Sequence, residues 1–233
     1  MTNGYNPADP RWHRLLGLAV HEFRTPVTVV AGYIRMLLTN RAGELNEQQR
    51  KLLQEAEKSC GRLSGLITEM SDLASLEAGT ASFNKSSVDV AALMSESIAA
   101  LLPLPDRAIE IVFTNEAPGV TVSADSSRLR MAFFAVLTAL RRELVTSTEL
   151  LVRMRRDTFE GQPVVWITVA DRDHIDTVDK SQPDQLGTFN EWRGGCGLTL
   201  AVARRIVSAH DGRLWSPTDD PKAGAVLLLP ANA

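Results

Sequence analysis

Apolar residues recur at intervals of three and four along two stretches in the first third of the chain. One covers residues 15–38 and the other residues 52–76, and polar residues fill the positions between. This spacing places the apolar side chains on one face of a helix. The pattern therefore predicts two helices of about 30 residues each, joined by a short loop as a helical hairpin.

Residues at the ends of these stretches support the same boundaries. Asp9-Pro10 predicts the first helix start, because a capping side chain followed by proline suits a helix N-terminus. Asn46 is a good N-cap for the second helix, and Gln49 stands at the capping-box position. Gly79 predicts the end of that helix.

The pattern changes after Gly79. Alternating, β-branched segments predict strands, and the segments are "IEIVFTNE", "VTVSAD", "LLVRMRRD", "PVVWITVAD", "GRLWSP" and "AGAVLLLPA". Helical spacing returns in "SSRLRMAFFAVLTALRREL" and in "GLTLAVARRIVSAHDG", where we expect Gly212 at the C′ position. We therefore expect an α/β sandwich in which helices cover one side of a single sheet.

The fold class is thus α+β, with residues 1–79 as the hairpin and residues 80–233 as the sandwich. A lone hairpin cannot bury both of its apolar stripes. We therefore expect two copies of the chain to pair into a dimeric four-helix bundle. Cys60 falls on the apolar stripe and is expected in this core.

Composition excludes several classes of protein. The net charge of −3 gives no reason to expect nucleic-acid binding. The two cysteines, Cys60 and Cys196, suggest neither a disulfide framework nor a zinc site. No apolar run is long enough to span a bilayer, and the N-terminus lacks a signal-peptide core. We expect a cytoplasmic protein, or a piece of a larger receptor from which the sensor region is missing.

Two motifs point to one family. "HEFRTPVT" resembles the H-box of the dimerisation and phosphoacceptor domain of two-component sensor histidine kinases, and "LITEMSDLASLEAG" resembles the end of that domain's second helix. "GGCGLTLAVARRIVSAHDGRLW" resembles the second glycine box of a GHKL-type ATP-binding domain and the helix after it. The resemblance covers residues 12–230 and implies a histidine kinase catalytic core.

The resemblance makes His21 the phosphoacceptor. A neutral imidazole can attack phosphorus and carry a labile phosphoramidate. Glu22 is placed to accept a ring proton, Arg24 to hold negative charge, and Thr25, one turn on, to position water. Pro26 removes a backbone hydrogen bond and is expected to bend the helix beside His21. His13 and His210 lack such neighbours and are expected at the surface or at helix ends.

The family's nucleotide site is only partly present. Its cofactors are ATP and Mg²⁺. Ala135 and Ala139 stand where the family carries asparagines, which leaves Glu143 as the candidate metal ligand on that helix. Asp171 matches the adenine-binding aspartate, while Asp173 and Ile175 replace the glycines that follow it. Of the second glycine box, Gly194, Gly195 and Gly197 match, and Thr199 replaces a glycine. The segment 176–192, where a mobile lid is expected, is short.

Three functions remain open. The first is a phosphorelay protein in which His21 exchanges a phosphoryl group with the aspartate of a response-regulator receiver domain. The replaced residues favour this one, because they argue against autophosphorylation. The second is an ATP-dependent histidine kinase with an unusual pocket. The third is a non-catalytic dimeric scaffold that binds a response regulator or another kinase.

Overall fold

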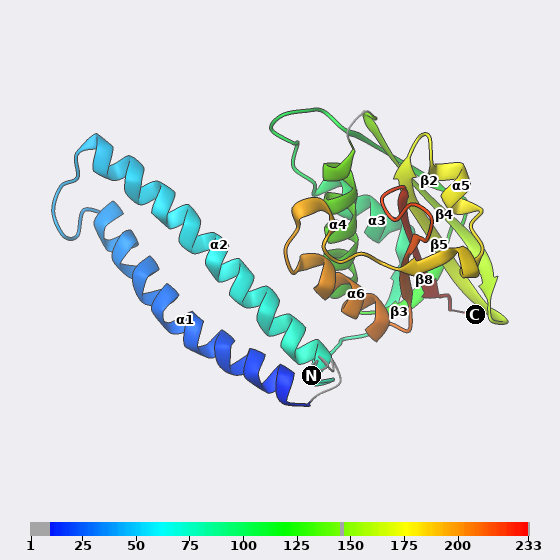
Figure 1. Ribbon diagram of the computed structural model, residues 1–233, viewed down its shortest axis with the longest axis horizontal. Coiled ribbons are helices and arrows are strands. Elements are labelled where there is room, and N and C mark those ends of the chain that lie inside the picture. Colours follow the sequence, from blue (N-terminus) through cyan, green and yellow to red (C-terminus); the bar gives the residue numbers. More distant parts are fainter. Residues whose placement is uncertain (1–9, 145–146, 233) are drawn as a thin grey trace, which may run out of the picture. The chain divides into compact units, whose positions relative to one another are not determined.

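The computed structural model describes residues 10–144 and 147–232, which fold into two compact units that divide between Ala81 and Ser82. The elements are α1 (Pro10–Leu38), α2 (Glu47–Glu77), β1 (Ser86–Asp89), α3 (Val90–Ala99), β2 (Glu110–Asn115), β3 (Thr121–Ala124), α4 (Ser126–Glu143), β4 (Glu149–Phe159), β5 (Gln162–Asp171), α5 (Ile175–Asp179), η1 (Pro183–Gln185), β6 (Leu186–Thr188), η2 (Arg193–Gly195), α6 (Thr199–Ala209), β7 (Arg213–Pro217) and β8 (Gly224–Pro230). Figure 1 shows these elements along the chain.

The first unit is the predicted helical hairpin. Its capping box is present, since the Asn46 side chain accepts from the Gln49 N–H at 2.8 Å and the Gln49 side chain accepts from the Asn46 N–H at 3.0 Å. Gly79 follows α2 with a φ of +65°, which a glycine adopts without strain. The expected cap Asp9 lies outside the described residues. The helix α1 runs unbroken through Pro26, and the bend there stays a prediction.

The second unit is built on a six-stranded sheet in the order β2-β4-β5-β8-β7-β6. Only β2 and β4 are parallel; the other neighbours in this sheet pair antiparallel. A two-residue turn at Glu160 and Gly161, both at positive φ, joins β4 to β5 in the expected hairpin. A separate two-stranded sheet pairs β1 with β3.

Helices cover both faces of the sheet, which differs from the one-sided sandwich predicted from the sequence. Helices α4 and α6 pack together over one face (Figure 1). On the other face, α5 packs on β5 and β8, and its Ile175 and Val178 join an apolar cluster around Trp166. The segment where the sequence suggested a mobile lid is therefore part of the packed structure: it forms α5, η1 and the edge strand β6.

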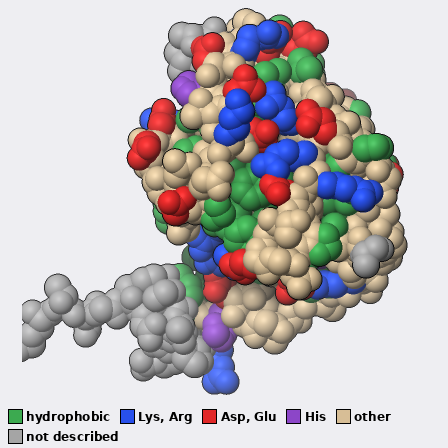
Figure 2. Space-filling model, turned by 90° about the vertical axis from the view of Figure 1, so that its right-hand side faces the viewer, with side chains coloured by type: hydrophobic (Ala, Val, Ile, Leu, Met, Phe, Trp, Pro, Cys, Tyr) green, Lys and Arg blue, Asp and Glu red, His purple; other side chains and the backbone are tan. Residues whose placement is uncertain are grey.

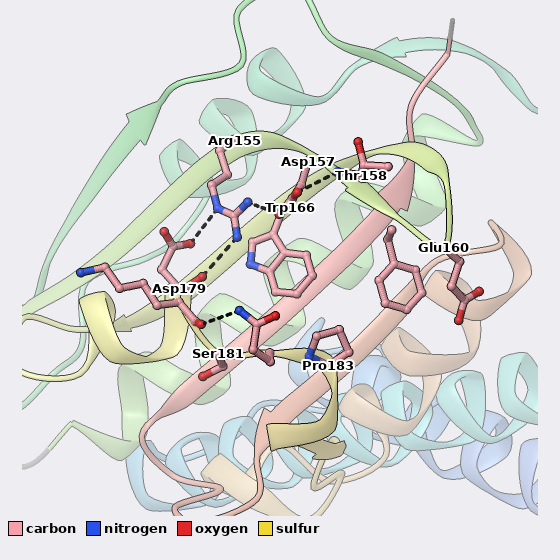
Figure 3. A pocket seen from close by; sticks show the side chains of 11 residues that line it. Arg155, Asp157, Thr158, Glu160, Trp166, Asp179, Ser181 and Pro183 are labelled. Carbon is pink, nitrogen blue, oxygen red and sulfur yellow. Dashed lines mark hydrogen bonds and ion pairs between the residues drawn. The ribbon is translucent and has the colours of Figure 1, made fainter.

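A buried carboxylate holds α5 on this face. Asp179 is 8% exposed and accepts a hydrogen bond from Thr168 Oγ1 at 2.6 Å. Arg153 and Arg155 each approach the same carboxylate at 3.5 Å. In Figure 3, Arg155 lies between Asp157, Asp179 and the ring of Trp166, whose centroid is 5.0 Å from the guanidinium carbon. A cavity of about 670 Å³ opens beside these residues. Figure 2, which shows the right-hand side of the view in Figure 1, has acidic and basic side chains intermixed around an apolar area.

The end of α6 also differs from the prediction. Asp211, with a φ of +59°, takes the C′ position expected for Gly212. Glycine is required at 212 for another reason, since a Cβ there would lie 2.5 Å from the Leu228 carbonyl oxygen. His210 caps the helix but is 3% exposed, so it is a buried residue rather than a surface one.

Candidate functional site

The predicted phosphoacceptor residues share the middle of α1. His21, Glu22, Arg24 and Thr25 all have exposed side chains, while Val20 beside them is 4% exposed and packs within the hairpin. The His21 side chain makes no hydrogen bond or ion pair within residues 10–144 and 147–232. An exposed imidazole without an internal partner can be reached by a docking protein.

The region of the second unit where the sequence predicts a nucleotide site contains a buried arginine. Arg193 is 4% exposed, and its Nε donates to Glu143 Oε2 at 2.7 Å. Its two terminal nitrogens donate to the carbonyl oxygens of Pro221 at 2.6 Å, Gly224 at 3.0 Å and Lys222 at 3.1 Å. Residues 193–197 are called the glycine segment below. Through Arg193, this segment is hydrogen-bonded both to the end of α4 and to the loop between β7 and β8.

The candidate metal ligand Glu143 is used within this arrangement. Its Oε2 pairs with Arg193, and its Oε1 accepts from the Gly194 backbone N–H at 2.9 Å. Both carboxylate oxygens thus have donors from the glycine segment. A carboxylate in this position serves as a counter-charge and a backbone cap, and a metal would have to displace those donors.

The predicted glycine cradle lies directly against α4. A Cβ on Gly194 would be 2.7 Å from Ala139 Cα and 2.8 Å from Ala139 Cβ. Gly194, Gly195 and Gly197 all have positive φ, which explains glycine at each. Ala139 is fully buried and Ala135 is 2% exposed. Ala139 thus forms the surface on which Gly194 packs, at a position where the family carries an oxygen-bearing side chain.

The predicted adenine-binding aspartate is engaged in a local turn. Asp171 Oδ1 accepts from the backbone N–H groups of Asp173 at 3.0 Å and His174 at 2.9 Å, and pairs with His174 Nδ1 at 2.7 Å. Asp173 is exposed, whereas Ile175 is 3% exposed and begins α5. Asp171 thus terminates β5 and starts the turn that carries the chain to the far face of the sheet.

The cavity beside Asp171 is small. Its volume is about 190 Å³, and its lining includes Glu143, His174 and Lys222. Sites for drug-sized ligands and cofactors span roughly 300–1,000 Å³. Within the described residues, no group of three or more His, Cys, Asp or Glu side chains could hold a metal ion. The residues present do not fit Mg²⁺ and a nucleotide, so we derive no chemical step through that cofactor.

The structure brings together residues that the sequence could not connect. Asp171 and Glu143 line one cavity, and Gly194 meets both Ala139 and Glu143. Sequence reasoning missed Arg193, because an arginine before a glycine run reads as a solvent-exposed loop residue. Nothing in a single sequence marks it as buried.

Comparisons with known proteins match the first unit to a domain family. Residues 11–79 match the His Kinase A (phospho-acceptor) domain, HisKA. The chain is 27% identical over 198 residues to the phosphate regulon sensor protein PhoR of Pseudomonas aeruginosa, covering 83% of this chain and 44% of PhoR. It is also 27% identical over 218 residues to the adaptive-response sensory kinase SasA of a Synechococcus strain, covering 87% of this chain and 54% of SasA.

The chain thus contains a HisKA domain and is similar to histidine kinases over most of its length. Its fold matches the crystal structure of full-length ShkA in complex with AMPPNP, with a TM-score of 0.68 over 94% of this chain and 46% of ShkA, at 24% identity. The chain spans about half the length of the curated relatives named above. In the part of the chain that the structure describes, no helix is long and apolar enough to cross a membrane.

Proposed function

We propose that this chain is a phosphorelay protein: His21 takes a phosphoryl group from a receiver-domain aspartate and gives it to another, without ATP chemistry in its second unit. The single observation that carries the proposal is the close packing of Gly194 on Ala139 in the second unit. The first unit, a HisKA domain, keeps His21 exposed. In the family, the second unit is the domain that supplies the phosphoryl group from ATP, but here its glycine segment packs on α4. We therefore take a phosphorylated partner protein as the source of the phosphoryl group.

The transfer balances without a further reactant. A ring nitrogen of His21 attacks the phosphorus of an aspartyl phosphate, so that an N–P bond forms and the P–O bond to the aspartate breaks. The aspartate leaves as a carboxylate. Glu22, next in the chain and exposed, accepts the proton lost by the ring, and Arg24 faces the charge of the phosphoryl group. Thr25 orients water for the hydrolytic branch.

The proposed partners follow from the first unit. Leu52, Leu63 and Leu66 of α2 remain exposed in the single chain, as a bundle that pairs with a second copy requires. We propose a homodimer through the hairpin, with a receiver domain docking beside His21. Neither Cys60 nor Cys196 forms a disulfide, which suits the reducing cytoplasm in which we place the reaction.

The test is phosphotransfer from a receiver domain labelled with ³²P-acetyl phosphate to the purified full chain. We expect acid-labile, alkali-stable label on the wild type and on His13→Gln, and none on His21→Gln. His13 is the matched control because it lies on the same helix and is half-buried. A parallel incubation with Mg²⁺ and γ-³²P-ATP should leave the chain unlabelled.

Two outcomes would contradict the proposal. Label from ATP that depends on His21 would restore the conventional kinase. If the chain binds labelled receivers but exchanges phosphate with none of the organism's receiver domains, the scaffold function replaces the relay.

A further inference from the structure

A third cavity lies at the end of α4, and its lining residues differ from those of the two cavities described above. Its volume is about 370 Å³, and it is lined by residues from the end of α3, the last turn of α4, the start of β2 and the loop over residues 101–109. Most of its wall is apolar, formed by Ile98, Leu101, Leu104, Ile109 and Ile111. It shares no lining residue with the cavity beside Asp171.

One wall of this cavity is formed by a buried arginine that has no counter-charge among the described residues. Arg141 is 7% exposed, and its Nε is buried with no hydrogen-bond partner. The Arg141 guanidinium makes no ion pair or hydrogen bond within residues 10–144 and 147–232. Burial lowers the pKa of Arg141, and the neighbouring charge of Arg142 lowers it further. An arginine stays charged in proteins, so this site carries an unbalanced positive charge.

A second arginine lines the same cavity. Arg107 donates from Nη1 to the carbonyl oxygen of Leu144 and from Nη2 to that of Arg142 at 2.6 Å, so the end of α4 holds its side chain. Its Nε is also buried without a partner. Glu110 lines the cavity too, but its side chain is exposed, and no ion pair joins it to either arginine in the described part of the chain. The apolar cavity is therefore lined by two buried N–H donors, the Nε groups of Arg107 and Arg141, and by the unbalanced positive charge of Arg141.

We propose that this cavity binds a small oxyanion attached to an apolar group, with a carboxylate or phosphate head at Arg141 and Arg107. The head supplies both the missing counter-charge and the acceptors for the buried donors, and a guanidinium fork suits either oxyanion. The aliphatic walls hold the apolar group. The cavity volume lies at the lower end of the range of small-molecule sites, which sets the ligand size.

The test uses the full chain and four probes, which vary the charged head and the apolar group separately. Hexanoate and hexyl phosphate carry the two candidate heads, hexanol carries no charge, and inorganic phosphate carries no apolar group. Binding is followed by isothermal titration calorimetry and by the thermal midpoint. The variants are Arg141→Met and, as the matched control one residue along the same helix, the exposed Arg142→Met.

We expect hexanoate or hexyl phosphate to bind saturably to the wild type and to Arg142→Met, and at least about tenfold more weakly to Arg141→Met. Whichever of the two binds more tightly identifies the head. Without any probe, Arg141→Met should melt no lower than the wild type, because the substitution removes an unbalanced buried charge. If Arg141→Met does not fold, Arg141→Lys replaces it, since lysine keeps the charge but loses the fork.

Four results would overturn the proposal. Equal binding to Arg141→Met and the wild type would remove the arginine from the site. If hexanol bound as tightly as hexanoate or hexyl phosphate, the charged head would play no part in binding. If inorganic phosphate bound as tightly as hexyl phosphate, the apolar walls would play no part. The absence of saturable binding of both hexanoate and hexyl phosphate to the wild type would show that the cavity takes no such ligand.

Discussion

Glu143 Oε2 accepts a hydrogen bond from Arg193 Nε at 2.7 Å, and Glu143 Oε1 accepts one from the N–H of the next residue, Gly194. This two-point contact fixes the glycine segment on the end of α4. The resemblance to histidine kinases assigns these regions to nucleotide and Mg²⁺. In this chain the end of α4 and the glycine segment are instead hydrogen-bonded to each other.

Removing one partner of this pair should destabilise the second unit strongly. For Arg193→Met we expect a loss of about 3–5 kcal/mol, because Glu143 and several carbonyl oxygens lose their donor in a buried place. Urea unfolding followed by tryptophan fluorescence measures it. Arg213→Met is the control, since its pair with Glu160 is exposed and worth less than about 1 kcal/mol. Equal losses for the two variants would contradict the importance of the buried pair.

Restoring a family residue should not restore nucleotide binding. Ala139→Asn places a larger polar side chain where Gly194 packs, and overpacking of this kind costs about 1–3 kcal/mol. We expect a lower thermal midpoint and no heat of Mg²⁺-ATP binding by calorimetry. Met131→Asn, at an exposed position on the same helix, controls for the substitution itself. A stable Ala139→Asn protein that binds ATP would show that the alanine alone closes the site.

The N-cap of α4 should make stability depend on pH in the acid range. Burial raises the pKa of Asp125, but hydrogen bonds from the Ser127 hydroxyl and from the backbone N–H groups of Arg128, Asn84 and Ser127 outweigh it and lower the pKa to about 2. A carboxylate whose pKa is depressed on folding stabilises the protein above its ordinary pKa, and the contribution is lost as the pH falls toward the folded value.

The measurement compares the wild type with Asp125→Asn, which keeps a capping side chain without the charge. At pH 6 we expect the variant to be less stable by about 2 kcal/mol, since one pKa unit corresponds to about 1.4 kcal/mol. This difference should shrink between pH 4 and 2, estimated from the ordinary and folded pKa values. The same substitution at the exposed Asp219 is the control. A difference that stays constant down to pH 2 would contradict this explanation.

The segment over α5 and β6 should be ordered in solution. Because Asp179 accepts from Thr168 and approaches Arg153 and Arg155, we expect slow amide hydrogen exchange in residues 175–188 of the wild type. Asp179→Ala should speed exchange there by at least about tenfold, while the exposed neighbour Lys180→Ala leaves it unchanged. Fast exchange of this segment in the wild type would show a mobile lid after all.

The sequence predicted those parts of the fold that depend on local signals. The capping box at Asn46 and Gln49, the helical period of the hairpin and the β-branched strands are all visible along the chain, and the structure confirms them. The H-box is also local, because its residues fall on one helix. The second helical layer was not predictable, since α5 has five residues and is held by the contact of Asp179 with β4 and β5.

The missed site residues share one physical reason. The burial of Arg193 and Arg141 depends on segments that are distant in the chain, and single-sequence patterns do not carry that information. The burial of His210 was missed in the same way, although its expected position at a helix end is confirmed. Its Nε2 accepts from the Asp125 N–H at 3.0 Å across 85 positions, and its Nδ1 lies 2.7 Å from the Ile206 carbonyl oxygen.

The bonds made by Arg193 also determine how the glycine segment can move. Lifting this segment from α4 would break the Glu143 pair and the carbonyl contacts together, so it is a local unfolding event and not a loop fluctuation. At a cost of about 3 kcal/mol, fewer than about one molecule in 100 would be open at any moment. A partner that requires the open form would therefore see its apparent affinity reduced by more than about a hundredfold.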